Sequence, residues 1–155
     1  MKKKTLLLIS CALASTQLNA APGCTQANLN GNYVMYQAAV NNPNLNHTGK
    51  CTITIISGVV SGSCAFGPNV SGNPNFSGPV YSPVTANAVM NSNCSATIPI
   101  SFDPVPGSVH IDSVFDVQFT ADKQSFIGRF GNNFGLQGTS NGTRYSPALP
   151  STPAP

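Results

Sequence analysis

The sequence predicts an all-β protein: a single antiparallel meander that closes as a small β-barrel, with a β-sandwich as the alternative, held by disulfides. Beyond the first twenty residues valine and isoleucine far outnumber leucine, and glutamate is absent, so the composition favours strands over helices. Short apolar segments alternate with turn residues and no helical interval separates them, which is typical of sequential hairpins. Four cysteines follow the N-terminal segment, an even number typical of small exported domains.

The N-terminus has the three parts of a secretion signal. Lysines at 2–4 precede an apolar run over 6–14, and the small residues Ala20 and Ala21 follow a polar stretch. The run is well short of the roughly 20 residues that span a bilayer. We therefore expect a signal peptide over 1–20, cleaved after Ala20 or alternatively after Ala21. The short signal favours a bacterial protein that is periplasmic or secreted.

Lipid attachment is the competing interpretation of this segment. Leu8–Cys11 resembles the lipobox of bacterial lipoproteins, in which the cysteine becomes the acylated first residue. The apolar stretch before Cys11 is short for that role, so we expect Cys11 to be removed with the signal. The remaining chain is expected to form one β-barrel domain over 24–145 and a flexible tail over 146–155, where closely spaced prolines favour an extended chain.

The charge of the chain excludes one class of partner. Three of the seven Lys and Arg residues lie in the signal, so four positive and four negative side chains remain beyond it. A neutral domain offers no basic surface to a phosphate backbone, and we expect no nucleic-acid binding. No later segment is long and apolar enough to predict a transmembrane span.

The first half of the domain contains the clearest hairpin signal. A Tyr- and Val-rich strand is predicted over Gly31–Val40, and a loop over Asn41–Gly49. Cys51–Ile55 alternates apolar and polar residues, as a half-buried strand does. Ser57–Gly58 fits a two-residue turn, because glycine accepts positive φ, and Val59–Phe66 is the returning strand.

This hairpin predicts the disulfides. Pairing positions 56 and 59 across the turn places Cys51 directly opposite Cys64. Counted from the turn, this is an open pair, whose Cα atoms lie about 4.5 Å apart, within disulfide range. Four thiols allow three pairings, and the hairpin selects Cys51–Cys64, which leaves Cys24–Cys94 by elimination.

The middle of the chain is rich in residues that interrupt regular secondary structure. Gly67–Pro83 is predicted to be a long surface excursion, since it is dense in Gly, Pro and Asn. Strands are expected over Val84–Met90 and Ser95–Phe102, and Pro99 suggests that the second lies at an edge or contains a bulge. Asp103–Gly107 is expected to be a turn.

A long strand is predicted over Val109–Thr120. Its odd-numbered apolar residues are expected to face the core: Val109, Ile111, Phe115, Val117 and Phe119. Its even-numbered residues are expected to face water: His110, Asp112, Asp116, Gln118 and Thr120.

The next strand, Ser125–Phe130, follows a turn at Asp122–Lys123. Pairing positions 120 and 125 places residue 119 against 126, 117 against 128 and 115 against 130, which builds an aromatic ladder on one face. A turn at Asn132–Asn133 and a short final strand over Gly135–Thr139 complete the prediction. Closure of such a meander would remove its exposed edges.

This layout resembles the lipocalin-type calycin barrels. Their early strand opens Gly-x-aromatic, as in Gly31-Asn32-Tyr33, and an arginine follows their last strand, as Arg144 does here. In those barrels a tryptophan at the aromatic position packs beneath the arginine and closes one end. The stretch Ser57–Cys64 also resembles the turn and strand of avidin-like barrels. This chain has no tryptophan, which departs from both patterns, and the lipocalin middle motif is not visible. The resemblance spans about residues 30–144 and implies a cup that holds a small molecule.

The residues that could support catalysis are few. Beyond the signal there are two histidines, four aspartates and no glutamate. His110 and Asp112 share a strand face and could begin a metal site, but a solvated outer face is the simpler interpretation. No Cys-x-x-Cys occurs, so the cysteines are interpreted as structural. We expect no cofactor, no metal site and no enzymatic activity.

Two functions are therefore open. The first is a non-catalytic barrel that binds a small apolar ligand in a cup lined or floored by Tyr33, Phe115, Phe119 and Phe126. These rings could equally fill a solid core. The second is an envelope or extracellular interaction module, an inhibitor or adhesion factor, that contacts protein or glycan through the loops Asn41–Gly49 and Gly67–Pro83.

Overall fold

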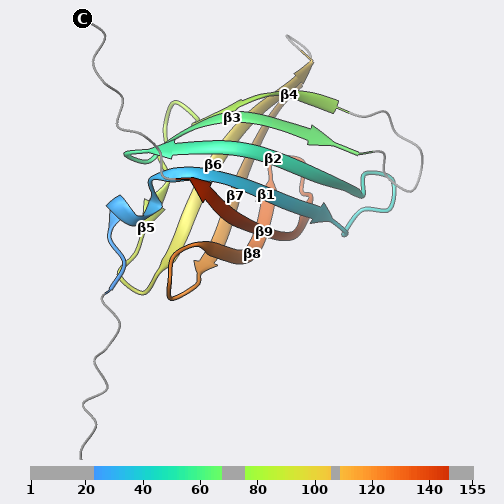
Figure 1. Ribbon diagram of the computed structural model, residues 1–155. Helices are drawn as coiled ribbons and strands as arrows, with labels where there is room; N and C mark the ends of the chain where they lie inside the picture. Colours follow the sequence, from blue (N-terminus) through green and yellow to red (C-terminus); the bar gives the residue numbers. More distant parts are fainter. Residues whose placement is uncertain (1–22, 68–75, 106–108, 147–155) are drawn as a thin grey trace, which may run out of the picture.

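The computed structural model describes residues 23–67, 76–105 and 109–146, and its strands wrap into a closed barrel (Figure 1). A short 3₁₀ helix, η1 (Gln26–Leu29), precedes the first strand. The strands are β1 (Gly31–Ala39), β2 (His47–Ile56), β3 (Val59–Phe66), β4 (Phe76–Tyr81), β5 (Val89–Met90), β6 (Ser95–Val105), β7 (Val109–Phe119), β8 (Ser125–Asn132) and β9 (Gln137–Ser146).

The described strands form one antiparallel sheet in the order β4-β3-β2-β1-β9-β8-β7-β6-β5, and an additional β4–β6 pairing closes it. Apart from the two-residue β5, eight strands make up the barrel wall. The predicted all-β meander barrel is confirmed, and the alternative of a sandwich is not adopted. Within this order β9 pairs with β1, which joins the first and last strands of the meander.

The predicted hairpin registers are confirmed. Cys51 pairs with Cys64 across the β2–β3 hairpin, and their Cα atoms lie 4.0 Å apart in a disulfide. The second disulfide joins Cys24 to Cys94. Across β7 and β8 the predicted aromatic ladder also forms, with residue 119 against 126 and residue 115 against 130. Two disulfides indicate an oxidising compartment. Among the described residues, no helix has the length and apolarity that crossing a membrane requires.

Two predicted loops were too long. The loop after β1 ends at Asn46 instead of Gly49, because the last residues of β1 pair with His47–Gly49, which belong to β2. The predicted excursion over Gly67–Pro83 contains β4, which pairs with β3 and closes the barrel on β6. Residues 76–81 therefore form a strand despite their Gly and Pro, because distant strands pair with them. Residues 68–75 lie outside the described ranges.

Other boundaries also differ from the prediction. Of Val84–Met90, only Val89–Met90 is a strand. The predicted turn at Asp103–Gly107 is wrong at its start, since β6 continues to Val105 through a register shift after Phe102. Residues 106–108 lie outside the described ranges.

The final strand is longer than predicted and begins later. It runs over Gln137–Ser146 instead of Gly135–Thr139, because β1 and β8 pair with it along most of its length. At the start of β7, Val109 is 41% exposed, so it does not face the core as predicted. On β6, Pro99 lies between the residues that pair with β5 and those that pair with β4, so it occupies a local edge, as its missing amide requires.

Inside the barrel, phenylalanine rings lie over glycines of the neighbouring strands. Gly142 pairs with Phe126, and a β-carbon added to Gly142 would lie 2.3 Å from the ring. A β-carbon on Gly49 would lie 2.5 Å from the Phe66 ring of the neighbouring strand. Each glycine thus leaves the space that a large ring on the adjacent strand occupies, and a narrow barrel accommodates several aromatic side chains.

One end of the barrel is closed by Arg144 and Tyr33. The guanidinium carbon of Arg144 lies 5.3 Å from the centre of the buried Tyr33 ring, and its Nη2 donates to Tyr33 Oη at 2.7 Å. The same nitrogen donates to the Asn28 carbonyl, and Tyr33 Oη donates to the carbonyl of Leu29 in η1. Burial raises the pKa of Tyr33, and the hydrogen bond and charge of Arg144 offset part of that rise. Arg144 therefore lies against the aromatic ring of the Gly31-Asn32-Tyr33 segment.

Candidate functional site

The four aromatic residues predicted to line or floor a cup all lie in the interior. Tyr33, Phe119 and Phe126 contact one another near the closed end, with ring centres 5.2–6.1 Å apart. Phe115 stacks on Phe130 at 5.3 Å. All five side chains are at most 4% exposed. The first three therefore pack together near the end closed by Arg144, and Phe115 and Phe130 stack across β7 and β8.

Two polar side chains interrupt this apolar interior. Gln37 on β1 and Ser140 on β9 are paired across the two strands and are 8% and 4% exposed. Ser140 lies between Gly138 and Gly142, the two glycines on which the Phe130 and Phe126 rings lie. Ser140 Oγ has no hydrogen-bond partner among the residues that the structure describes. A buried hydroxyl without a partner is rare in native proteins and requires an explanation.

The inner wall near Gln37 is also small and polar. Gln37 pairs with Gly49 on β2, and Ser140 pairs with Gly128 on β8, so four neighbouring strands carry no apolar side chain at this level. Gln37 Nε2 lies 3.4 Å from Nε2 of His47, whose ring meets Phe66 edge to face.

Neither Gln37 nor Ser140 was predicted as a site residue, although the sequence pattern already contained a signal for Gln37. Gln37 continues the inward alternation of Tyr33 and Met35 along β1, so the pattern already placed an amide inside. Ser140 could not be placed, because the predicted last strand ended at Thr139 and left it outside.

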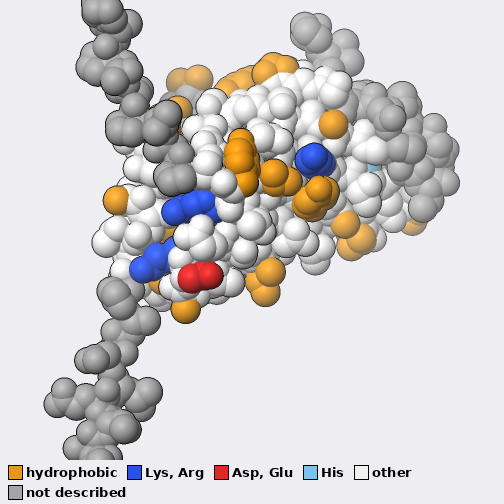
Figure 2. All heavy atoms as spheres, in the orientation of Figure 1, with side chains coloured by type: hydrophobic (Ala, Val, Ile, Leu, Met, Phe, Trp, Pro, Cys, Tyr) orange, Lys and Arg blue, Asp and Glu red, His pale blue; other side chains and the backbone are white. Residues whose placement is uncertain are grey.

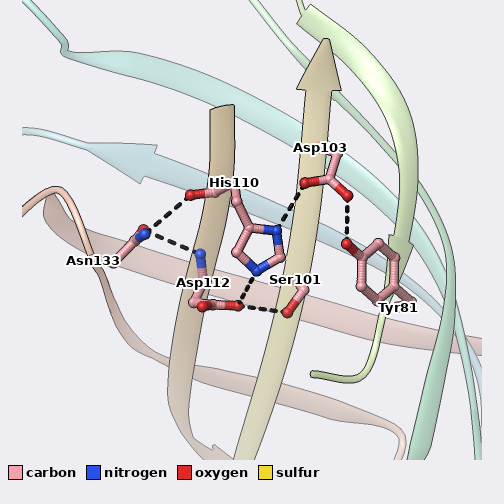
Figure 3. A network of polar contacts seen from close by, with 6 residues as sticks. All are labelled: Tyr81, Ser101, Asp103, His110, Asp112 and Asn133. Carbon is pink, nitrogen blue, oxygen red and sulfur yellow. Dashed lines mark hydrogen bonds and ion pairs between the residues drawn. The ribbon is translucent and has the colours of Figure 1, made fainter. Parts of the chain in front are cut away.

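A second polar cluster lies on the outer face of the barrel, where β4, β6 and β7 meet (Figure 3). Tyr81 Oη donates to Asp103, and Nδ1 of His110 lies 2.8 Å from the other oxygen of that carboxylate. His110 Nε2 lies 3.1 Å from Asp112 Oδ1, which also accepts a 2.6 Å bond from Ser101 Oγ. The predicted outward orientation of His110 and Asp112 is confirmed.

The turn between β8 and β9 supports this cluster. Asn133 accepts from the Asp112 amide at 3.1 Å and donates to the His110 carbonyl at 3.0 Å (Figure 3). These two bonds fix the backbone of β7 at the positions that carry the imidazole and its carboxylate partner.

The geometry of the cluster suits neither a metal ion nor a nucleophile. The two ring nitrogens of His110 point away from each other, so Asp103 and Asp112 lie on opposite sides of the ring and do not converge on one point. Within 23–67, 76–105 and 109–146, no group of three or more ligating side chains could hold a metal ion. The Ser101 hydroxyl bonds to Asp112 and not to the imidazole, so His110 does not activate it.

The hydrogen bonds within this cluster shift the pKa values of three of its members. The hydrogen bond that His110 donates to Asp103 raises the pKa of His110 above its ordinary 6.5, and the bonds that Asp103 accepts from Tyr81 and His110 lower the pKa of Asp103 below 3.8. The same bond to Asp103 raises the pKa of Tyr81. All three shifts favour a neutral phenol, a carboxylate and an imidazolium, which attract one another.

The face of the barrel seen in Figure 2 carries few charged side chains. Asp116, the remaining predicted outward aspartate of β7, pairs with Arg129 at 3.1 Å. A shallow groove of ≈ 410 Å³ runs across four strands and is lined mainly by small and polar residues: Tyr36, Gln37, Ala38, Thr48, Gly49, Lys50, Ala65, Gly67, Thr139 and Asn141. It includes none of the predicted ligand residues.

Comparisons of the chain with models of protein families, with curated proteins and with solved structures found no match.

Proposed function

We propose that this protein is an exported, non-catalytic binding protein whose barrel holds a small molecule with an apolar body and one hydrogen-bonding group. The disulfides support export, because such bonds persist in oxidising compartments. The closure of one end by Arg144 over Tyr33 supports a cup of the calycin type, open at the opposite end.

The observation that carries the proposal is the unpartnered hydroxyl of Ser140. Burying a hydroxyl without a hydrogen bond costs about 1–3 kcal/mol, and a solid apolar core avoids that cost by using alanine. A ligand that hydrogen-bonds to Ser140 and Gln37 would remove the cost. Few, well-placed polar groups in an apolar pocket are typical of small-molecule sites.

The aromatic residues supply the apolar contact surface. Phe115 and Phe130 would form a wall, and the packed rings of Tyr33, Phe119 and Phe126 would form the floor. The ligand would therefore lie above the floor, in the half of the barrel that contains Gln37, Ser140 and Phe66. This differs from a cup lined equally by all four predicted aromatics.

The first test is native mass spectrometry of the protein purified from its own source, in which a co-purifying small molecule is expected. The second uses the apolar probe N-phenyl-1-naphthylamine, whose amine can donate to Ser140. We expect Ser140→Ala to weaken binding of this probe about 2- to 10-fold, the size of one lost neutral hydrogen bond. Fluorescence titration measures the affinity.

Thr139→Ala is the matched control, because Thr139 is the adjacent residue of β9 and points outward. It should leave the affinity for the probe unchanged. Equal affinity in the S140A variant and the wild type, together with no co-purifying molecule, would refute the proposal.

The interaction-module function is favoured by a separate observation at the open rim. Val40, Leu45 and Phe134 are 66%, 40% and 53% exposed there. The loops that carry them are held together, since Asn41 donates to the Gly135 carbonyl at 2.9 Å and accepts from the Gln137 amide at 2.7 Å. Apolar side chains on an ordered rim suit contact with an extracellular protein.

The triple variant V40S/L45S/F134S separates the two functions. If the rim is the functional surface, this variant should lose a crosslinked complex formed in the medium or periplasm of the source, while probe affinity stays unchanged. If the cup is the functional site, the same variant should retain its co-purifying small molecule.

A further inference from the structure

The closure between β4 and β6 is the shortest junction between two wall strands in the described barrel. It consists of two residue pairs, Val80 with Phe102 and Tyr81 with Ser101. On its other side β4 has six pairs with β3, and β6 has nine with β7. Because each backbone pair contributes to holding a sheet together, the barrel is expected to open first at this junction.

The outer polar cluster spans this same junction (Figure 3). Tyr81 belongs to β4, Ser101 and Asp103 to β6, and His110 and Asp112 to β7. The bond from Tyr81 to Asp103 is the side-chain contact that crosses from β4 to β6 in this view. His110 then holds the Asp103 carboxylate from the far side at 2.8 Å. The position of the acceptor for Tyr81 therefore depends on His110.

We propose that Tyr81, Ser101, Asp103, His110 and Asp112 form a protonation-dependent latch, which holds the β4–β6 junction closed while the imidazole carries two protons and loosens it when one is lost. A doubly protonated ring donates to both carboxylates at once. After one proton leaves, one ring nitrogen presents a lone pair to a carboxylate, and that contact becomes repulsive. Either Asp103 or Asp112 must then move. Movement of Asp103 takes the acceptor away from Tyr81, and movement of Asp112 frees the ring that orients Asp103.

Three ionisable side chains face His110 from the elements around it. They are Asp103 on β6, Asp112 on β7 and Tyr81 on β4, whose ring centre lies 6.5 Å from that of His110. The turn after β8 contributes the uncharged Asn133. With two carboxylates and one imidazolium, the cluster has a net charge of −1, and losing the proton makes it −2.

The direction of the pH effect follows from these partners. The pKa of His110 is raised, so the stabilisation is fully present below 6.5 and is lost as the pH rises through the raised value. The pKa of Asp103 is lowered, so its contribution is present above 3.8 and is lost as the pH falls through the lowered value. The latch is therefore tightest in weak acid and looser in weak alkali, whether or not the barrel holds a ligand.

Hydrogen exchange of the intact, disulfide-bonded chain tests this inference. Amides of Val80–Tyr81 and Ser101–Phe102 should exchange about two- to fivefold faster at pH 8 than at pH 5.5 after correction for intrinsic rates, as expected when an exposed ion pair is lost. His110→Asn should abolish this difference, because asparagine does not titrate. Tyr81→Phe should give fast exchange of these amides at both pH values.

Two controls separate the latch from general pH effects. His47→Asn removes the other histidine of the domain and should leave the pH difference intact. Asp116 lies on β7, as His110 does, and forms an exposed ion pair with Arg129 of β8. Asp116→Asn breaks that pair and should also leave the pH difference intact. Equal corrected rates at pH 5.5 and 8 in the wild type, or an undiminished difference in H110N, would overturn the latch. If H110N does not fold, exchange in Tyr81→Phe at pH 5.5 and pH 8 serves as the test, and slow exchange at pH 5.5 in that variant would overturn the latch.

Discussion

Replacing Phe126 by alanine is expected to lower the free energy of unfolding by about 3–5 kcal/mol, the range for truncating a buried aromatic ring. Phe126 is 1% exposed and contacts the rings of Tyr33 and Phe119. Its ring also covers Gly142 on the neighbouring strand, which has no side chain to occupy the vacated space. The cavity is therefore expected to persist, because a rigid barrel wall cannot collapse into it. Urea denaturation monitored by circular dichroism measures the change.

Ile127→Ala is the matched control, since Ile127 is the next residue of β8, points outward and is 71% exposed. It should change the free energy of unfolding by roughly 0.5 kcal/mol or less. Similar losses in F126A and I127A would show that the ring does not support the interior described above. A native domain is stable by only about 5–15 kcal/mol, so F126A should also melt well below the wild type.

Removing the Cys24–Cys94 disulfide is expected to cost about 4 kcal/mol, and removing Cys51–Cys64 about 3 kcal/mol. The first bridge closes a loop with a sequence separation of 70, and the second one of 13. A longer loop restricts the unfolded chain more, so its loss releases more conformational entropy. Paired serine variants, C24S/C94S and C51S/C64S, should be compared by denaturant unfolding.

The order of these two losses is the discriminating result. If C51S/C64S is the less stable variant, then restriction of the unfolded chain is not the main contribution of these bridges. The first bridge also anchors the segment that leads into η1, where Cys24 N donates to the Ser92 carbonyl at 3.1 Å. Loss of that anchor should loosen the closed end.

Local patterns in the chain were sufficient to predict the hairpins. Each of the two strongest predictions depended on a short turn that follows an alternating strand segment, around Ser57–Gly58 and around Asp122–Lys123. In such a hairpin the turn sets the register, and the register sets which cysteines or rings face each other. Both disulfides and the aromatic ladder of β7 and β8 followed from that local information.

Strand β4 could not be predicted in the same way. Its sequence contains Gly78 and Pro79, which are typical of loops, and nothing near it in the chain indicates a strand. It becomes a strand because β3 and β6 offer unpaired backbone on either side. The same reason accounts for the length of β9, which extends past Thr139 because β1 and β8 both need a partner there.

The candidate sites also divide into features that local sequence determines and features that barrel closure determines. Composition, turn residues and alternation are local properties, and they establish the class of fold, the bridging of the cysteines and the outward direction of His110 and Asp112. Which residues meet across the barrel depends on closure, which joins segments far apart in the chain. Closure alone places Ser140 beside Gln37 inside the wall and brings Tyr81 to the carboxylate that His110 holds.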